Sequence, residues 1–202
     1  MFIPKEFEIT DRAEVLAFIR RYNFGVIVSQ ADGAPVATHL PFHVMERDGE
    51  IVLTAHFARA NAQWKGIEEQ LVMVIFSQPH AYISPSHYDK EQSVPTWNYV
   101  AVHAYGRCEV ITDTTKGLGI LEQMIQQSEP GYMAQWERLD EKYKLGMYKG
   151  IVPVEITVTA TKAAGKLSQN KTEAERQRII DTLGASDDSA ERDVAEYMKR
   201  GM

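Results

Sequence analysis

Two Asp-Gly dipeptides, Asp32-Gly33 and Asp48-Gly49, constrain the fold of this chain more than any other feature. Each follows a run of apolar and β-branched residues and precedes another such run. Asp-Gly at such a place is a strong signal for a tight β-hairpin, because both residues accept the positive φ angles of its turn. The strands that these turns join are expected over residues 24–29, 36–45 and 51–56, with an edge or bulge at Pro41. Successive hairpins predict an antiparallel sheet.

The periodicity of apolar residues predicts the remaining elements. Helices are expected over residues 11–22, from about 61, over 114–128 and 132–146, and after 170 with a break near Gly184. Further strands are expected over residues 71–76, 80–83, 97–111 and 152–159, and a long ordered loop over 84–96. Six or seven strands without strand–helix alternation predict an α+β fold, a mostly antiparallel β-barrel with flanking helices.

The composition indicates an ordinary globular protein. Of the 202 residues, 44% are hydrophobic and 25% are charged. We expect a barrel domain with its N-terminal helix over residues 1–165 and a helical extension over residues 166–202 that packs on the same core. Neither a membrane helix nor a signal peptide is recognisable, which indicates a cytoplasmic protein. The single cysteine, Cys108, lies in an apolar strand, so we expect a buried, unreactive thiol.

The charge disfavours a protein that depends on phosphate contacts with nucleic acid. The formal net charge is −6, and such proteins carry a basic excess or stripe. The one basic stretch is modest and comprises Lys162, Lys166, Lys171, Arg176 and Arg178.

The last two helices superficially resemble a helix-turn-helix, but the second begins with acidic residues, Asp187, Asp188 and Glu191, that would repel DNA. Direct DNA binding is therefore expected to be weak or absent. Apolar residues of these helices should pack on the barrel or on a partner subunit: Ile179, Leu183, Val194 and Tyr197.

The familiar catalytic and metal-binding patterns are not recognisable. The sequence has neither a Gly-x-Ser-x-Gly elbow nor a phosphate-binding glycine loop, and we predict no catalytic residues. His39 and His43 are four residues apart, which spans about 13 Å on a strand. That separation is too long for one ion, so no metal site is predicted.

Two segments suit a ligand, and each has a simpler interpretation. Around residues 54–64 a strand gives way to a helix next to Arg59, and a helix N-terminus beside an arginine suits an anion. Alternatively, Asn61 only caps the helix and Arg59 is solvated. Trp97, Tyr99 and His103 alternate along one strand face, which suits a planar ring, although such aromatic residues are more often part of the core.

Five motifs, taken in order, resemble those of the PaiB family of FMN-binding negative transcriptional regulators. They are His39-Leu40-Pro41-Phe42, His56-Phe57-Ala58-Arg59-Ala60-Asn61, Ala81-Tyr82-Ile83-Ser84-Pro85, Val94-Pro95-Thr96-Trp97-Asn98-Tyr99 and Lys166-Leu167-Ser168-Gln169-Asn170. The resemblance implies a split barrel of the pyridoxamine-phosphate-oxidase type, a homodimer, and an FMN site at the subunit interface. It also implies repression of sporulation and degradative-enzyme (protease) genes.

The resemblance further implies which residues bind the cofactor. Arg59 would hold the FMN phosphate, with His56 nearby and the backbone of Ala58, Ala60 and Asn61 beside it. The strand segment Thr38, His39, Leu40 and Pro41 would lie along the isoalloxazine ring. Thr96, Trp97 and Asn98 would approach from the long loop, and Lys166, Gln169 and Asn170 would close the site. The chain departs from the family pattern at Ala62-Gln63, where Pro-Gln is expected.

Two classes of function follow from these residues and motifs. One is a regulator that binds FMN, or retains only a vestigial pocket, and acts on transcription directly or through a partner protein. The other is a flavin- or haem-dependent oxidoreductase of the same superfamily, in which His56 or His103 would supply the axial ligand of a haem. The substrate residues of the oxidase itself are not recognisable, so oxidase activity on pyridoxamine phosphate is not implied.

Overall fold

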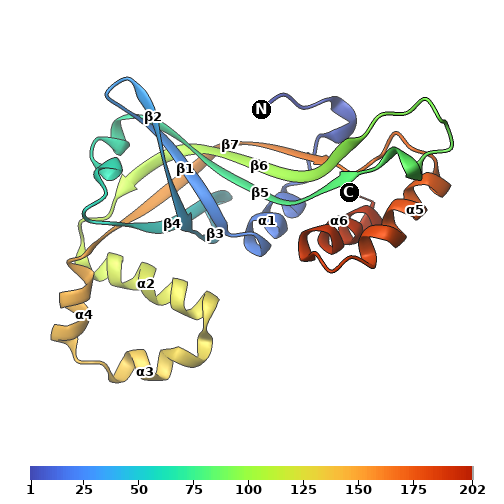
Figure 1. The fold of residues 1–202 in the computed structure, drawn as a ribbon. Coiled ribbons are helices and arrows are strands. Elements are labelled where there is room, and N and C mark those ends of the chain that lie inside the picture. Colours follow the sequence, from blue (N-terminus) through green and yellow to red (C-terminus); the bar gives the residue numbers. More distant parts are fainter. Residues whose placement is uncertain (202) are drawn as a thin grey trace. The chain divides into compact units, whose positions relative to one another are not determined.

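The computed structural model describes residues 1–201, which form seven strands and six α-helices (Figure 1). The strands are β1 (Phe24–Ala31), β2 (Ala34–Pro41), β3 (His43–Arg47), β4 (Glu50–Ala58), β5 (Leu71–Ile83), β6 (Thr96–Val110) and β7 (Ile151–Lys166). The helices are α1 (Arg12–Arg21), α2 (Thr114–Ser128), α3 (Met133–Arg138), α4 (Glu141–Tyr148), α5 (Glu173–Gly184) and α6 (Ser189–Arg200). None of these helices is long and apolar enough to cross a membrane.

The hairpin turns form as the Asp-Gly dipeptides predict. Asp32 and Gly33 have φ angles of 52° and 77°, and Asp48 and Gly49 have φ angles of 53° and 82°. Positive φ at both central residues matches the right-handed twist of the flanking strands. The first turn brings Ala31 opposite Ala34, and the pairing of β1 with β2 then continues to Phe24 opposite Pro41.

The strands hydrogen-bond in the order β2-β1-β5-β6-β7-β4-β3, which makes one seven-stranded sheet. The pairs β1–β2, β1–β5, β3–β4 and β4–β7 are antiparallel. Pro41 is the last residue of β2, which is an edge strand of the sheet. A proline is tolerated there, because an edge strand has a neighbour on one side only and can lack one backbone N–H.

Four expected boundaries differ from the structure, and the two helical ones have a local reason. The helix expected from residue 61 is instead two short 3₁₀ turns, because Gly66 between them adopts a left-handed conformation with φ 71°. The expected strands over 71–76 and 80–83 are one strand, β5, which runs through the cis peptide bond before Pro79. The helix expected over 132–146 is divided into α3 and α4 at Leu139, after which Asp140 caps α4. The last strand, β7, continues beyond the expected end at 159 to Lys166.

The described residues form two compact units, and strands β5, β6 and β7 contribute one end to each. The first unit contains the N-terminal segment to Phe18, residues 76–103, and the chain from Lys162 onward. Its core includes the inner faces of α5 and α6, where Ile179, Leu183, Val194 and Tyr197 are buried as expected. The Tyr197 ring meets the Phe18 ring edge-on at a centroid distance of 6.3 Å.

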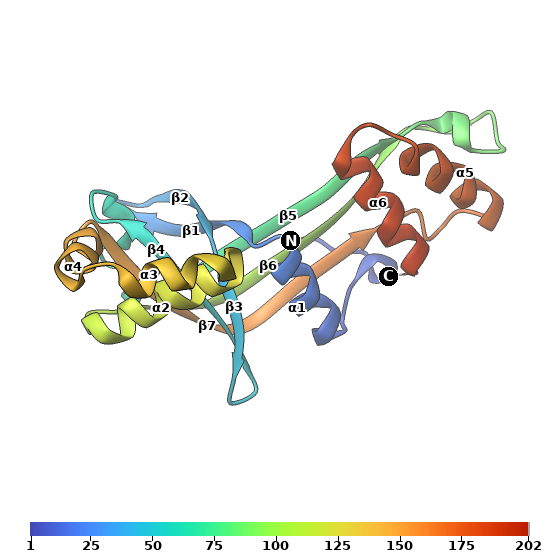
Figure 2. The ribbon, with the colours of Figure 1, turned by 90° about the horizontal axis from the view of Figure 1, so that it is seen from below.

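The second unit contains residues 19–75 and 104–161. In it, α2, α3 and α4 follow one another as a helical arm between β6 and β7, and Figures 1 and 2 both place α2 beside β3. The core of this unit includes Ile27, Leu53, Phe57, Val74 and Ile156, none of which is more than 1% exposed.

Candidate functional site

Arg59 directly follows β4 and is held by the backbone at the start of β7. Its Nε donates a hydrogen bond to the Lys149 carbonyl (2.7 Å), and its Nη2 donates one to the Ile151 carbonyl (2.6 Å). Its backbone N–H donates to the Gly150 carbonyl at 2.8 Å. The other N–H groups of the guanidinium form no hydrogen bond or ion pair with the described residues. The side chain is therefore fixed in place and retains donors for an anion.

Arg59 lies on the wall of a cavity of about 990 Å³ between the end of β4 and the helical arm. Its lining is completed by Thr112, Thr114, Glu141, Lys142, Leu145, Gly146, Tyr148 and Lys149. The lining contains three positively charged side chains and two threonine hydroxyl groups, but only one carboxylate. Such donors fit a phosphate monoester, and the volume lies within the range of small-molecule sites, about 300–1,000 Å³.

Tyr148 of α4 forms a buried part of that cavity wall. Burial raises the pKa of its phenol, while the positive charge of Arg59 acts in the opposite direction. The phenol packs directly against Gly117 of α2, where a Cβ atom would overlap it. A glycine at this position therefore allows α2 and α4 to approach each other closely and to shape the cavity.

Thr38 and Asn61, two of the expected site residues, meet in one hydrogen-bond network. Asn61 Nδ2 donates to Thr38 Oγ1 (2.8 Å), and the Thr38 hydroxyl donates to Gln63 Oε1. Gln63 Nε2 reaches the carbonyls of Ile27 and Val36, both at 3.2 Å. The buried Gln63 thus ties the segment after β4 to β1 and β2. Its role was missed from the sequence, which shows it only as a polar residue among small ones.

The segment after β4 does not provide the helix N-terminus that was expected beside Arg59. Directly after Asn61 it forms a short 3₁₀ turn, Ala62–Trp64, and the Asn61 side chain accepts a hydrogen bond from the Gln63 N–H at 2.9 Å. One short turn has too few aligned peptide groups for a useful dipole. The simpler interpretation of Asn61 as a cap is therefore correct, whereas Arg59 is bound to carbonyl groups rather than merely solvated.

The other expected residues of this unit lie along β2 and β4. His39 is exposed and stacks on Phe24 at a centroid distance of 6.2 Å, Leu40 is buried, and Pro41 is exposed. Ala58 and Ala60 are exposed on either side of Arg59. His56 is half-buried, its Nδ1 has no hydrogen-bond partner, and burial lowers the pKa of its imidazole.

The remaining expected residues belong to the first unit, where all but Asn170 make defined contacts. Lys166 Nζ donates to Thr96 Oγ1, which joins the end of β7 to the start of β6. Trp97 is 53% exposed, and its ring meets those of His80 and Tyr82 edge-on at 5.8 and 5.9 Å.

Asn98 and Gln169 are occupied by contacts within the first unit. Asn98 is fully buried and exchanges two hydrogen bonds with the Ser168 hydroxyl, at 3.0 and 3.1 Å. Gln169 accepts from the Leu167 N–H at 2.7 Å and donates to the Gly165 carbonyl. These two side chains stabilise the turn that presents Lys166, whereas Asn170 is exposed.

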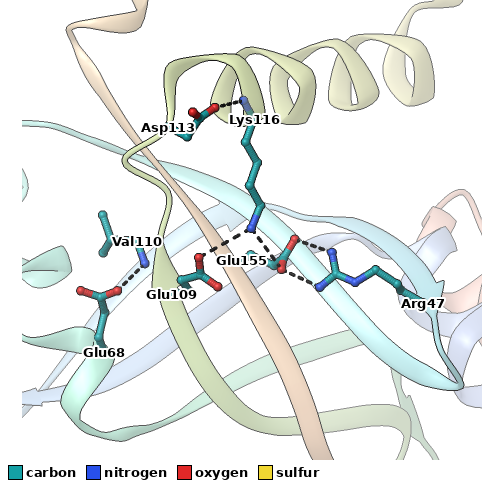
Figure 3. Close-up of polar contacts among 7 residues, drawn as sticks. All are labelled: Arg47, Glu68, Glu109, Val110, Asp113, Lys116 and Glu155. Atoms are coloured by element: carbon teal, nitrogen blue, oxygen red, sulfur yellow. Dashed lines mark hydrogen bonds and ion pairs between the residues drawn. The ribbon is translucent and has the colours of Figure 1, made fainter.

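A charged network anchors the first turn of α2 (Figure 3). The carboxylate of Glu155 on β7 is 7% exposed and accepts two hydrogen bonds from Arg47 of β3, at 2.6 and 3.0 Å. Lys116 of α2 lies 3.6 Å from Glu155 and 3.6 Å from Glu109. The hydrogen bond from Arg47 is the main cause that lowers the pKa of Glu155. The network therefore joins the β3–β4 hairpin to the start of the helical arm.

Metal-ligating residues do not gather in the described part of the chain. Among residues 1–201, no group of three or more His, Cys, Asp or Glu side chains is arranged to hold an ion. His39 and His43 belong to different strands, since Phe42 separates β2 from β3.

Comparison with solved structures shows a shared fold. The flavocytochrome Anf3 of Azotobacter vinelandii superposes with a TM-score of 0.61 at 20% identity, over 79% of this chain and 69% of that one. An FAD- and haem-binding protein of Mycobacterium smegmatis gives a TM-score of 0.62 at 16% identity, over 85% and 78% of the two chains. These likenesses confirm the expected α+β, mostly antiparallel fold of the split-barrel flavoproteins.

Comparison of sequences identifies the family. The "protease synthase and sporulation protein PAI 2" of Bacillus subtilis is 37% identical over 202 residues, which covers 98% of this chain and 97% of that protein. An uncharacterised protein of Emericella nidulans is 28% identical over 71% of this chain and 73% of its own length. Residues 1–160 match the family described as "Putative FMN-binding domain". The chain therefore belongs to this FMN-binding domain family, in agreement with the PaiB-type motifs of its sequence.

Proposed function

We propose that this chain is an FMN-binding regulator that lowers the expression of sporulation and protease genes. The observation that carries the proposal is the 37% identity to the Bacillus subtilis protein, which extends over 98% of the chain. Similarity over almost the whole length covers the residues around Arg59, the helical arm and the C-terminal helices alike. Its test is transcript measurement in cells that lack the gene. Protease and sporulation transcripts should rise and should fall again on complementation, and unchanged transcripts would contradict the regulatory role.

The proposed FMN site is centred on Arg59, whose spare donors would hold the phosphate. The cavity beside Arg59 adds Lys142, Lys149 and two threonine hydroxyls as further partners for an anion. The other expected residues remain proposed FMN contacts, each within its own unit. The second unit contributes Thr38, His39, Leu40, Pro41, His56, Ala58, Ala60 and Asn61, and the first unit contributes Thr96, Trp97, Asn98, Lys166, Gln169 and Asn170. When bound, FMN would supply a redox-active ring. Asn98 and Gln169 would act by positioning their neighbours, because their own polar groups are already bonded.

FMN titration monitored by fluorescence quenching tests the phosphate contact. Arg59→Gln should weaken FMN binding about 10- to 100-fold, which corresponds to the loss of charged hydrogen bonds worth about 1.5–3 kcal/mol. Arg59→Lys should give an intermediate affinity, since it keeps the charge and loses the fork. Arg107→Gln is the matched control, because Arg107 is an exposed arginine on β6 away from the cavity lining. Melting curves must show that every variant is folded, because Arg59 also bonds two carbonyl groups.

The outcomes of this titration separate the parts of the proposal. Equal affinities of Arg59→Gln and Arg107→Gln would remove Arg59 from the site. Failure of the wild-type protein to bind FMN would leave a vestigial pocket. The absorbance spectrum of the purified protein addresses the alternative oxidoreductase, because flavin and haem have different bands, and reduction by NAD(P)H would favour an enzyme.

We further propose that the protein is a homodimer with the flavin at the interface, as its family resemblance implies. A two-fold interface would use the same patch on both subunits. Light scattering at micromolar concentration should give twice the 22.9 kDa of one chain. A mass of one chain would contradict the dimer and would require a site built within a single subunit.

A further inference from the structure

Helix α4 is too short and too little buried to be stable by itself. All eight of its residues, Glu141–Tyr148, are described by the structure, and only Tyr148 among them is buried. Isolated helices of fewer than about 12–15 residues are marginal in water even when they are rich in good helix formers. Gly146 in the interior of α4 lowers its helical propensity further. The order of this helix therefore depends on what its sides contact.

The two ends of α4 are held to different degrees. At the C-terminal end, the Tyr148 phenol packs directly against Gly117 of α2. In the N-terminal half, residues 141–143 are exposed, and the Lys144 ammonium lies 5.0 Å from the centroid of the Trp136 ring of α3. No hydrogen bond or ion pair among the described residues joins this half to a strand. The first turn of α4 is therefore attached to another part of the helical arm and is free to loosen from the sheet.

One side of α4 faces the cavity beside Arg59. Lys142, Gly146 and Lys149 share this side, because they are four and then three residues apart, and all three line the cavity. Arg59 lines the same space from the end of β4, and Glu141 is the single carboxylate of the lining. Three like charges around one space repel one another. A phosphate group, which carries a charge of about −1.5 to −2 at neutral pH, attracts all three instead.

We propose that a phosphate group held by Arg59 also binds Lys142, and that this bridge fixes α4 beside the end of β4. The inference rests on the proposed phosphate site at Arg59 and adds a form of regulation to it: occupancy of the site sets the order of the helical arm. A ligand that binds the fixed arm more tightly than the loosened arm favours the fixed arm by the ratio of the two affinities. The arm thereby gives a regulator two distinguishable states, loaded and empty.

Hydrogen exchange of the full chain, followed by mass spectrometry, measures the order of α4. It is recorded for the protein alone, with saturating FMN, with riboflavin, which has the same ring without the phosphate, and with millimolar inorganic phosphate against chloride at equal ionic strength. FMN and inorganic phosphate should slow the exchange of residues 141–149 about tenfold, the value of one charged hydrogen bond of about 1.4 kcal/mol. Riboflavin and chloride should not. Residues 152–158 of β7, which pair with β4, are the internal reference and should not change.

Two lysine variants of the same helix test the bridge. Lys142→Gln should abolish the slowing by FMN and should weaken FMN binding by the same factor of about ten, because the coupling between binding and arm order is reciprocal. Lys144→Gln is the matched control, since Lys144 lies over Trp136 and does not line the cavity. In this variant the ratio of exchange rates with and without FMN should stay as in the wild-type protein.

The outcomes separate this inference from the FMN proposal. Unchanged exchange of α4 in protein that FMN saturates, as fluorescence quenching shows, would overturn the inference and leave FMN binding intact. Equal slowing in the wild-type protein and in Lys142→Gln would overturn it too, as would the absence of slowing by both FMN and inorganic phosphate. If FMN does not bind but inorganic phosphate slows α4 only when Lys142 is present, the coupling stands and the FMN proposal fails.

Discussion

Replacing Glu155 by glutamine should destabilise the fold, because this carboxylate is the buried centre of the network in Figure 3. The substitution keeps the size of the side chain and removes its charge. The new amide would offer one acceptor oxygen to Arg47 and would turn an NH₂ group toward the remaining cations. The charged hydrogen bonds at 2.6 and 3.0 Å, and the 3.6 Å approach of Lys116, would be lost or weakened together.

The magnitude follows from how much of each partner is buried. A hydrogen bond to a charged group contributes about 1.5–3 kcal/mol, and breaking a fully buried pair costs about 3–5 kcal/mol. Glu155 is 7% exposed but Arg47 is 47% exposed, so water can replace part of the lost pairing on the arginine side. We expect a loss of about 2 kcal/mol in the free energy of unfolding. In a chain of this size that lowers the melting temperature by about 4–8 °C.

The difference between the two proteins should depend on pH in a defined direction. The pKa of Glu155 is lowered in the folded state, so its ionised form stabilises the fold above the ordinary glutamate pKa of about 4.3. That contribution is lost as the pH falls through the lower folded-state pKa, because the carboxyl group is then protonated in both states. The stability gap between wild type and Glu155→Gln should therefore be constant near neutral pH and shrink in acid.

Urea unfolding followed by circular dichroism at a series of pH values measures this gap. Glu109→Gln is the matched control, since Glu109 contacts the same Lys116 at 3.6 Å but is 64% exposed. It should cost less than about 1 kcal/mol, as exposed ion pairs do. The reasoning would be refuted if the two variants lost equal stability at neutral pH, or if the Glu155→Gln gap did not shrink in acid.

Three further predictions concern separate parts of the chain. The Cys108 thiol, whose pKa burial raises to about 12, should resist alkylation at pH 8 in the folded protein and react once it is unfolded in urea. Gly117→Ala should cost about 1–3 kcal/mol in urea unfolding, because the new Cβ would overlap the Tyr148 phenol, whereas Gly119→Ala on the same helix has open space and should not destabilise. The C-terminal helices should not bind DNA tightly, since Arg176 bonds the Leu167 and Met198 carbonyls and Arg178 bonds the His87 carbonyl and Asp89. Sequence-selective gel shifts at low salt, lost on truncation after Gly184, would contradict this last expectation.

The sequence predicts those parts of the fold that depend on local chemistry. The Asp-Gly turns, the helical periodicity of residues 11–22 and 114–128, and the alternation around Val154 each act within a few residues, and these elements appear where expected. Two of the strand boundaries that differ, those of β5 and β7, depend on longer-range pairing. β5 continues through Pro79, although a proline in a run of residues favours a break. The long β7 likewise extends beyond its alternating segment, which periodicity alone cannot reveal.

The candidate site is less predictable than the fold, because its residues gain their roles from partners far along the chain. Arg59 is recognisable in the sequence as a candidate anion ligand, but the carbonyl groups that fix it belong to residues about 90 positions later. Gln63 and Glu155 look like ordinary polar residues in the sequence. In the structure both are buried: the Gln63 side chain hydrogen-bonds to β1 and β2, and the Glu155 carboxylate anchors α2. The strands under α2 carry both a carboxylate that Arg47 and Lys116 pair with and a histidine whose Nδ1 has no partner, and the sequence alone does not distinguish the two. Sequence patterns thus identify residues with suitable chemistry, whereas the hydrogen bonds that a side chain makes, or leaves unmade, show which of them are available to a ligand.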